Sequence, residues 1–121
     1  MAREILTEQP KEYSHFSPGQ YTYFRLFNHD GDYGRAAVSE HPQSLEVHLE
    51  LSRWGVGVRR SLEEDAAWLR SQADSLGKTR IVGIKQESGT PDPRWPKFTR
   101  ILGFTGHSLL QTAFIEVNGP S

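Results

Sequence analysis

The hydrophobic pattern of residues 45–85 changes its period twice, and this change constrains the fold more than any other feature of the sequence. Apolar and polar residues alternate over residues 45–51, which is the period of a strand with one buried face. Over residues 62–76 the apolar residues recur every three or four positions, which predicts a helix that ends before Gly77. Residues 79–85 again have the pattern of a strand. Short loops join the segments, so we expect a βαβ unit with parallel strands.

The helix of this unit has two candidate starting points. Ser61, followed three residues later by Glu64, forms a capping-box pattern, which makes Ser61 the N-cap. Carboxylates at residues 63–65 would then lie in the first turn and repel an anion there. If the helix instead begins near Val56, its first N–H groups follow a Gly-x-Gly loop and form a site for an anion such as a phosphate. The sequence alone is compatible with both.

The residues before the βαβ unit are expected to extend the sheet. Residues 21–27 and 33–40 have strand patterns on either side of a turn signal at residues 28–32. Together with the strand that opens the βαβ unit, they predict an antiparallel meander. Residues 1–20 show little periodicity and include two prolines, so we expect an irregular arm with one short strand around residues 4–7.

Two more elements are expected after the βαβ unit. A second helix begins at Asp92 as its N-cap, with Pro93 in the first position, and ends at Gly103, before a last strand over residues 108–117. The predicted fold is of the α/β (α+β) class, with a mixed central sheet of about five to six strands, an antiparallel meander, a βαβ unit and two main helices. The chain is expected to divide into an arm of residues 1–20, a single domain of residues 21–117 and a tail of residues 118–121.

Composition excludes several classes of function. The 121 residues include no cysteine, which excludes disulfides, thiol nucleophiles and thiolate metal sites, and no clustered ligand set predicts another metal site. The net charge is −1, from 14 basic and 15 acidic side chains, so nucleic acid, which requires a basic field, is not an expected partner. No apolar run reaches the roughly 18–20 residues that span a membrane. No signal peptide is recognisable, so we expect a cytoplasmic protein without membrane association.

Two segments carry a resemblance to a known family. The first is residues 52–57 (Ser-Arg-Trp-Gly-Val-Gly), between strand and helix, and the second is residues 98–104 (Phe-Thr-Arg-Ile-Leu-Gly-Phe). Together with the order of strands and helices, they resemble the GNAT N-acyltransferases, and the short chain is similar to bacteriophage-encoded GNAT-like proteins. The resemblance implies transfer of an acetyl or other acyl group from acyl-CoA to an amine, in the host cytoplasm if the chain is phage-encoded.

The resemblance also implies where the acyl donor binds. In the family, backbone amides of the first segment hold the pyrophosphate of acyl-CoA, so acetyl-CoA is the expected cofactor. Arginine side chains near such a loop add charge-assisted hydrogen bonds to phosphates. The residues expected to bind acetyl-CoA are Arg53, Trp54, Gly55, Val56, Gly57, Arg59 and Arg60.

Candidate catalytic residues lie on the strand before the glycine loop. Glu46, His48 and Glu50 share its polar face, and a histidine beside a carboxylate can be oriented to deprotonate an amine acceptor. Glu46 and His48 are therefore the predicted catalytic residues. An ordinary polar strand face, exposed to solvent or to a partner, would show the same pattern. The family's frequent general acid is a tyrosine, and Thr99 stands at that position, so no general acid is assigned.

The aromatic content supports an alternative, in which a catalytically degenerate GNAT fold binds or inhibits a partner protein. Aromatic residues make up 11% of the chain, more than a short βαβ core requires. Tryptophan and tyrosine are the side chains that most often anchor protein interfaces. Trp54 and Trp95 are the candidate partner-binding residues in this interpretation.

Overall fold

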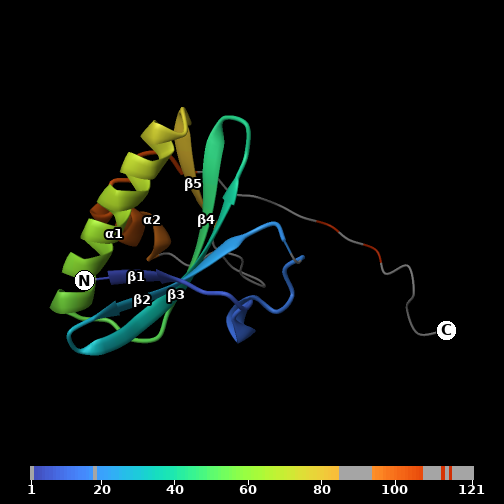
Figure 1. The fold of residues 1–121 in the computed structure, drawn as a ribbon. Coiled ribbons are helices and arrows are strands. Elements are labelled where there is room, and N and C mark those ends of the chain that lie inside the picture. Colours follow the sequence, from blue (N-terminus) through green and yellow to red (C-terminus); the bar gives the residue numbers. More distant parts are fainter. Residues whose placement is uncertain (1, 18, 85–93, 108–112, 114, 116–121) are drawn as a thin grey trace.

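The computed structural model describes residues 2–17, 19–84 and 94–107, together with Ala113 and Ile115 (Figure 1). These residues form a five-stranded sheet with two α-helices on one of its faces. The strands are β1 (Ala2–Ile5), β2 (Thr22–Asn28), β3 (Gly31–Glu40), β4 (Ser44–Leu51) and β5 (Arg80–Ile84). The helices are α1 (Val56–Ser75), α2 (Trp95–Ile101) and a short 3-10 helix, η1 (Lys11–Tyr13). No helix in this described part of the chain is long and apolar enough to cross a membrane.

The sheet confirms the predicted meander and βαβ unit. Its strand order, β1-β2-β3-β4-β5, follows the chain, and the first four strands pair antiparallel. β4 and β5 pair in parallel, from Ser44 opposite Arg80 to His48 opposite Ile84, with α1 as the connection between them. β4 continues to Leu51 and so extends past the described end of β5.

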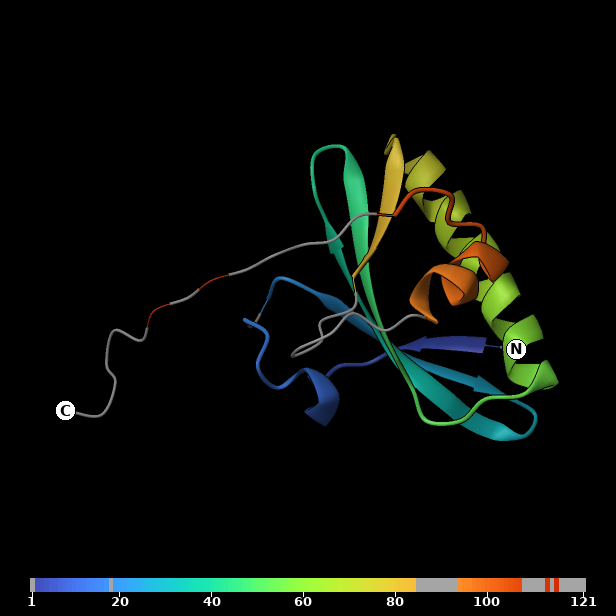
Figure 2. The ribbon, with the colours of Figure 1, turned by 180° about the vertical axis from the view of Figure 1, so that it is seen from behind.

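Alternating side chains divide the core between the two faces of the sheet. On one face, buried residues of β2 and β3 pack against Val58 and Leu62 of α1. On the other face, Tyr13 of η1 packs against Tyr23 and Ala37. Figure 2 shows α1 and α2 together on the first face, so the second face is covered by the residues between β1 and β2.

Of the two helix starts that the sequence allows, Ser61 is wrong and the start near Val56 is confirmed, because α1 begins at Val56. Ser61 lies in the second turn, is 6% exposed, and accepts a hydrogen bond through Oγ from Nδ2 of Asn28. Packing decides the start, since Val58 is 1% exposed and holds the first turn against the sheet. Gly55, with a φ of +155° that side-chain-bearing residues rarely adopt, is the N-cap. The acidic residues after Ser61 therefore lie outside the first turn.

The amino-terminal residues contribute more regular structure than predicted. The short strand expected around residues 4–7 lies at Ala2–Ile5 and pairs with β2, with Ala2 opposite Phe27. Further along, η1 places Tyr13, which is 3% exposed, in the core of the second face. Burial of an aromatic ring orders this segment, and local periodicity gives no signal for that.

The helix ends agree with the sequence better than the helix starts do. Gly77 follows α1 with a φ of +72°, and Gly103 follows α2 with a φ of +98°, as glycines after a helix commonly do. The N-cap of α2 is Arg94 rather than the predicted Asp92, and the helix begins at Trp95. Pro96 in its first turn needs no N–H partner, which favours this start.

Several predicted features lie outside the described residues. They include Asp92 and Pro93 themselves, the end of the second βαβ strand at Lys85, and most of the last strand expected over residues 108–117. Within that last range the structure describes Ala113 and Ile115, and neither belongs to a strand.

Candidate functional site

The amino end of α1 presents uncapped backbone N–H groups. The carbonyl of Gly55 accepts the first helical hydrogen bond, from the N–H of Arg59 at 2.9 Å. The N–H groups of residues 56–58 therefore have no acceptor within the helix. No side chain caps the helix, and no acidic residue lies in its first turn. With the dipole of a 20-residue helix behind them, these groups can bind an anion.

The space beside Gly55 and Gly57, next to the N–H groups of the first turn, is open. An added Cβ at Gly55 would meet no atom within 4 Å, and one at Gly57 would meet only Oδ2 of Asp30, at 4.0 Å. Asp30 lies in the β2–β3 turn, and its carboxylate is an opposing charge that an anion at the loop would face. The sequence did not indicate this neighbour, because the turn is far from the loop along the chain.

Arg53 links the glycine loop to the β2–β3 turn through three hydrogen bonds. Its Nε donates to the carbonyl oxygen of Asp32 at 3.0 Å, and its Nη2 donates to the carbonyl oxygen of Gly31 at 3.0 Å. The same Nη2 donates to Oδ1 of Asn28 at 2.7 Å. These bonds tie the loop before α1 to the β2–β3 turn. Arg53, a predicted acetyl-CoA ligand, is thus engaged with protein acceptors that fix the position of the loop.

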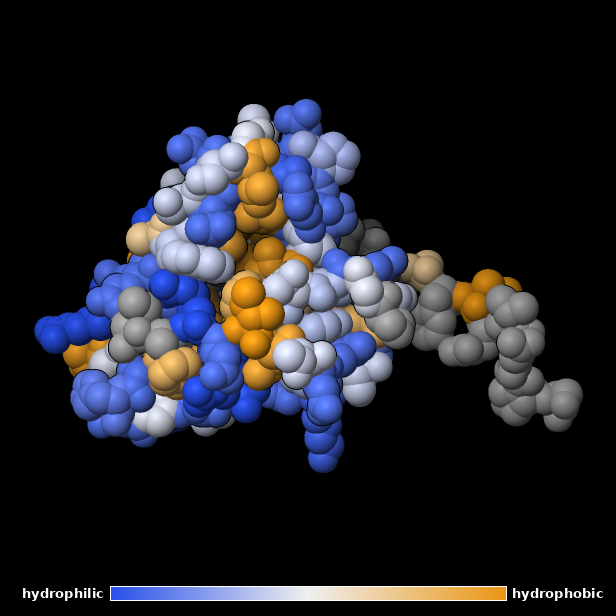
Figure 3. Space-filling view, viewed as in Figure 1, coloured by the Kyte–Doolittle hydropathy of each residue, from blue (hydrophilic) through white to orange (hydrophobic). Residues whose placement is uncertain are grey.

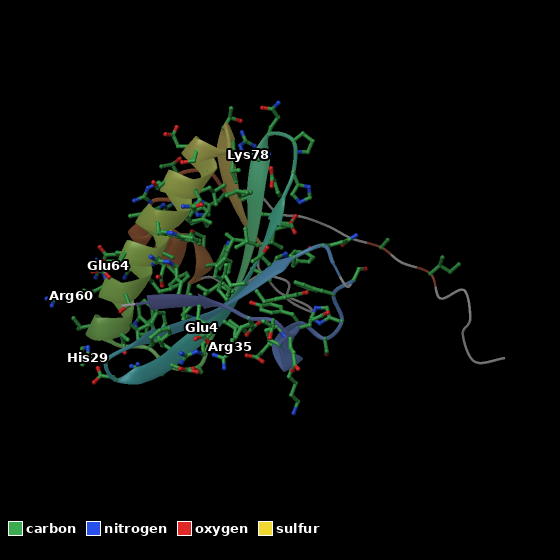
Figure 4. All side chains as sticks on the ribbon, in the orientation of Figure 1. Glu4, His29, Arg35, Arg60, Glu64 and Lys78 are labelled. Atoms are coloured by element: carbon green, nitrogen blue, oxygen red, sulfur yellow. The ribbon has the colours of Figure 1, made fainter. Side chains whose placement is uncertain are left out.

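Arg59 and Arg60 place positive charge on the first two turns of α1. Nε of Arg59 lies 3.2 Å from Oε1 of Glu63, and both side chains are exposed, so this ion pair contributes little to stability. Arg60 is exposed and points away from the sheet (Figure 4). We expect both positive charges to attract an anionic ligand to this end of the helix.

The two predicted tryptophan anchors differ in exposure. Trp54, beside the glycine loop, is 53% exposed and contacts Phe98 of α2 edge-on, with ring centroids 5.6 Å apart. Trp95 is partly buried, and the centroid of its ring lies 6.1 Å from that of Phe98. On its other side the ring packs against β5, where a Cβ added at Gly83 would meet it at 3.8 Å. Of the two tryptophans, only Trp54 has most of its surface exposed.

A cavity of about 90 Å³ lies between the sheet and the two α-helices. Apolar side chains form almost all of its wall, including Leu49 of β4, Ala66 of α1 and Phe98 of α2. Figure 3 shows a band of apolar side chains that reaches the surface between α1 and the strands. The cavity was not predicted, because voids depend on how distant elements pack.

Glu46 is the centre of a polar cluster on the other face of the sheet. Its Oε2 accepts a hydrogen bond from the Tyr21 hydroxyl at 3.0 Å and lies 3.0 Å from Nε2 of His48. Its Oε1 lies 3.6 Å from Nε2 of His41. Burial raises the pKa of Glu46, but its hydrogen bonds with His48 and Tyr21 outweigh this and hold the pKa below its ordinary value. Glu46 is therefore a carboxylate at neutral pH.

The structure thus brings together the predicted pair of Glu46 and His48, and it adds Tyr21 and His41, which the sequence analysis missed. Burial, with the hydrogen bond to Glu46, raises the pKa of the Tyr21 hydroxyl, so this group remains a proton donor to the carboxylate. Glu50, which shares the polar face of β4, is exposed near the end of the strand and is not among the side chains that contact Glu46.

Aromatic side chains cover His48, which is 8% exposed. The rings of Phe16 and Tyr21 pack edge-on against its imidazole, with centroids at 4.9 Å and 5.7 Å. Gln9 fixes this cover by donating through Nε2 to the carbonyl oxygen of Phe16 at 2.9 Å. A molecule that approached His48 from this face would have to displace the ring of Phe16.

Thr99, on α2, has a structural role. It is 3% exposed, and its Oγ1 donates to the carbonyl oxygen of Trp95 at 2.9 Å. The same oxygen lies 2.6 Å from Nε2 of His107, so its hydrogen-bonding capacity is used internally. Among the residues that the structure describes, no group of three or more side chains is suited to hold a metal ion.

The fold is that of the GNAT acetyltransferases. The structure is similar to glucosamine-6-phosphate N-acetyltransferase from Arabidopsis thaliana, with a TM-score of 0.53 and 11% identity over 80% of this chain and 68% of that one. It is also similar to a protein described as an acetyltransferase from Pyrococcus furiosus, with a TM-score of 0.52 and 18% identity over 86% and 72% of the two chains. No protein-family model matches the sequence, and no curated protein matches it significantly. At these identities the likeness establishes the fold, and function has to be argued from the site.

Proposed function

We propose that this chain is an acyl-CoA-dependent N-acyltransferase, which transfers an acetyl or other acyl group from acyl-CoA to an amine. The observation that carries the proposal is the amino end of α1, where the N–H groups of residues 56–58 are uncapped and no carboxylate lies in the first turn. A diphosphate offers the negative charge and the acceptor oxygens that such a helix end favours. The fold shared with acetyltransferases supports the same class of ligand.

The surroundings of the loop fit acyl-CoA as the donor. The positions in front of Gly55 and Gly57 are open, which gives a diphosphate access to the N–H groups. When bound, acyl-CoA supplies an activated thioester, and the residues of this chain bind and orient it.

Glu46 and His48 are proposed to serve the amine acceptor. The ionised Glu46 carboxylate attracts an ammonium group, which is the form of most free amines at neutral pH. His48, oriented by Glu46 through Nε2, is the proposed base, and its other ring nitrogen takes a proton from the ammonium form of the acceptor. The free amine nitrogen then attacks the thioester carbonyl, the C–S bond breaks as the amide forms, and the thiolate of CoA takes up the second amine proton and leaves as the thiol. In this proposal Phe16 moves aside when the acceptor binds.

Calorimetric titration with acetyl-CoA tests the proposal. We expect the affinity to fall by about tenfold or more when Gly57 is replaced by leucine, because the side chain would obstruct the N–H groups. The variant is expected to fold, since an added Cβ at Gly57 meets no atom closer than 4.0 Å. Ala67→Leu, on the exposed side of α1, is the control and should bind as the wild type does. If the wild type shows no binding at millimolar acetyl-CoA, the proposal is overturned.

Removing the charge of Asp30 is expected to strengthen binding of acetyl-CoA. Its carboxylate lies beside Gly57, and Asp30→Asn removes a repulsion that we expect to be worth about two- to fivefold in affinity at low salt. The gain should shrink as ionic strength rises. Asp74→Asn, at the exposed carboxyl end of α1, is the matched control and should have no effect. Equal affinities for both variants at low salt would show that the ligand binds away from the loop.

A second candidate function is binding or inhibition of a partner protein by a catalytically inactive GNAT fold. Trp54 and Val56 are 53% and 72% exposed at the same end of α1, and exposed apolar side chains of this kind anchor interfaces. A partner retained by Glu46→Gln but lost with Trp54→Ala would favour this function. Turnover of acetyl-CoA by the wild type that Glu46→Gln abolishes would favour the enzyme.

A further inference from the structure

The ring of Phe16 fills a space between other rings, directly beside the polar cluster of Glu46. It stacks on the ring of Tyr13, with centroids 5.1 Å apart, and its centroid lies 4.6 Å from that of Tyr21. It also packs edge-on against the imidazole of His48, at 4.9 Å. We call this space, bounded by Tyr13, Tyr21 and His48, the ring slot. Phe16 is partly exposed, so solvent reaches the slot.

The ring slot lies next to the charge that the proposed acceptor requires. The Tyr21 hydroxyl and Nε2 of His48 each lie 3.0 Å from Oε2 of Glu46, so two of the three side chains that bound the slot contact this carboxylate. A molecule in the slot would therefore meet aromatic faces with a negative charge beside them. Both attract a cation.

The acceptor has to displace Phe16 to reach His48, and the slot determines which molecules do so at little cost. A small aliphatic amine would leave the faces of Tyr13 and Tyr21 uncovered, and the contacts that Phe16 makes with them would be lost. A flat aromatic ring restores these contacts. Each such pair of rings is worth about two- to tenfold in affinity beyond the area that it buries.

We propose that the amine acceptor is an arylalkylamine, whose ring takes the place of the Phe16 ring and whose ammonium group pairs with Glu46. The inference rests on the proposed function, because it takes Glu46 and His48 as the acceptor site. The link between ring and nitrogen is short, since the imidazole lies only 4.9 Å from the ring that is replaced. About two carbon atoms span this distance, as in 2-phenylethylamine.

Dissociation constants of three amines test the inference, measured by calorimetry in the presence of CoA at pH 7, where all three are ammonium ions. We expect 2-phenylethylamine to bind about tenfold more tightly than 2-cyclohexylethylamine, which has a similar size and no aromatic face. Butylamine, which cannot fill the slot, should bind more weakly still.

Equal affinities for the phenyl and cyclohexyl compounds would show selection for apolar bulk alone and would overturn the inference. The inference also fails if none of the three amines binds. The proposed function is decided separately, by binding of acetyl-CoA and by its turnover with a wider panel of amines, and it stands if either outcome above is found together with turnover.

Two alanine substitutions locate the ring of the bound amine. Phe16→Ala empties the slot, so the ligand no longer competes with a side chain of the protein, and we expect 2-phenylethylamine to bind about five- to tenfold more tightly. Gln9 holds the carbonyl oxygen of residue 16, so the backbone should keep its path in this variant. Phe27→Ala is the matched control on β2, because it removes a ring that packs on Arg25 outside the slot.

We expect Phe27→Ala to leave the dissociation constant of 2-phenylethylamine unchanged. An affinity that stays the same or falls in Phe16→Ala would place the ligand's ring elsewhere and overturn the inference. The wild-type series decides the matter alone if Phe16→Ala does not fold.

Discussion

An Asp65→Ala variant is expected to be less stable than the wild type by about 3–5 kcal/mol. Asp65 projects from α1 toward the sheet, and its side chain is 11% exposed. One carboxylate oxygen pairs with Nη1 of Arg3 at 2.6 Å, and the other accepts from the hydroxyl of Tyr33, a residue with 0% exposure. Alanine removes the acceptor that these two buried donors share, and the cost of their lost hydrogen bonds is large in a dry environment.

Urea denaturation followed by circular dichroism measures this change. Glu64→Ala is the matched control, because Glu64 is the preceding residue of the same helix and its side chain is exposed (Figure 4). We expect it to change the free energy of unfolding by no more than about 0.5 kcal/mol. If the two variants were equally stable, the contact of Asp65 with β1 and β3 would not hold α1 against the sheet.

A Glu46→Gln variant is expected to lose roughly 100- to 10,000-fold in kcat, the range of general acid–base catalysis. Glutamine keeps the shape of the side chain and can still accept a hydrogen bond from Tyr21. It lacks the negative charge that attracts an ammonium group and orients His48. The affinity for acetyl-CoA should stay nearly unchanged, because none of the side chains that contact Glu46 belongs to the glycine loop.

Thiol release with a panel of amine acceptors gives kcat, and calorimetry gives the affinity for the donor. The control is Glu50→Gln, which makes the same change on the same face of β4 at an exposed position. We expect this variant to retain the wild-type kcat. Full activity in Glu46→Gln would remove Glu46 from the mechanism, and a parallel loss in both variants would indicate a general effect of charge.

The strands and the crossover helix could be predicted because their signals are local. The alternation over residues 45–51 and the glycines after each helix depend on neighbours in sequence, and the structure places both as expected. The pairing of Glu46 with His48 was also within reach, since residues two apart on a strand share a face.

The remaining features depend on contacts between distant residues. The capping-box pattern at Ser61 is genuine in sequence, but burial of Val58 extends the helix beyond it. The hydrogen bond between Tyr21 and Glu46 joins residues 25 apart, and the one between Tyr33 and Asp65 joins residues 32 apart. No local pattern distinguishes such pairs from other polar residues on exposed faces. The cavity is likewise a product of tertiary packing.

The order of the strands has a consequence for how the chain folds during its synthesis. β2, β3 and β4 each pair with the strand made just before them, so the meander can assemble by closing local loops as it leaves the ribosome. β5 pairs with β4 only after the whole of α1 has been made and has crossed the sheet. The apolar side of a nascent meander therefore stays uncovered for the time that α1 takes to emerge.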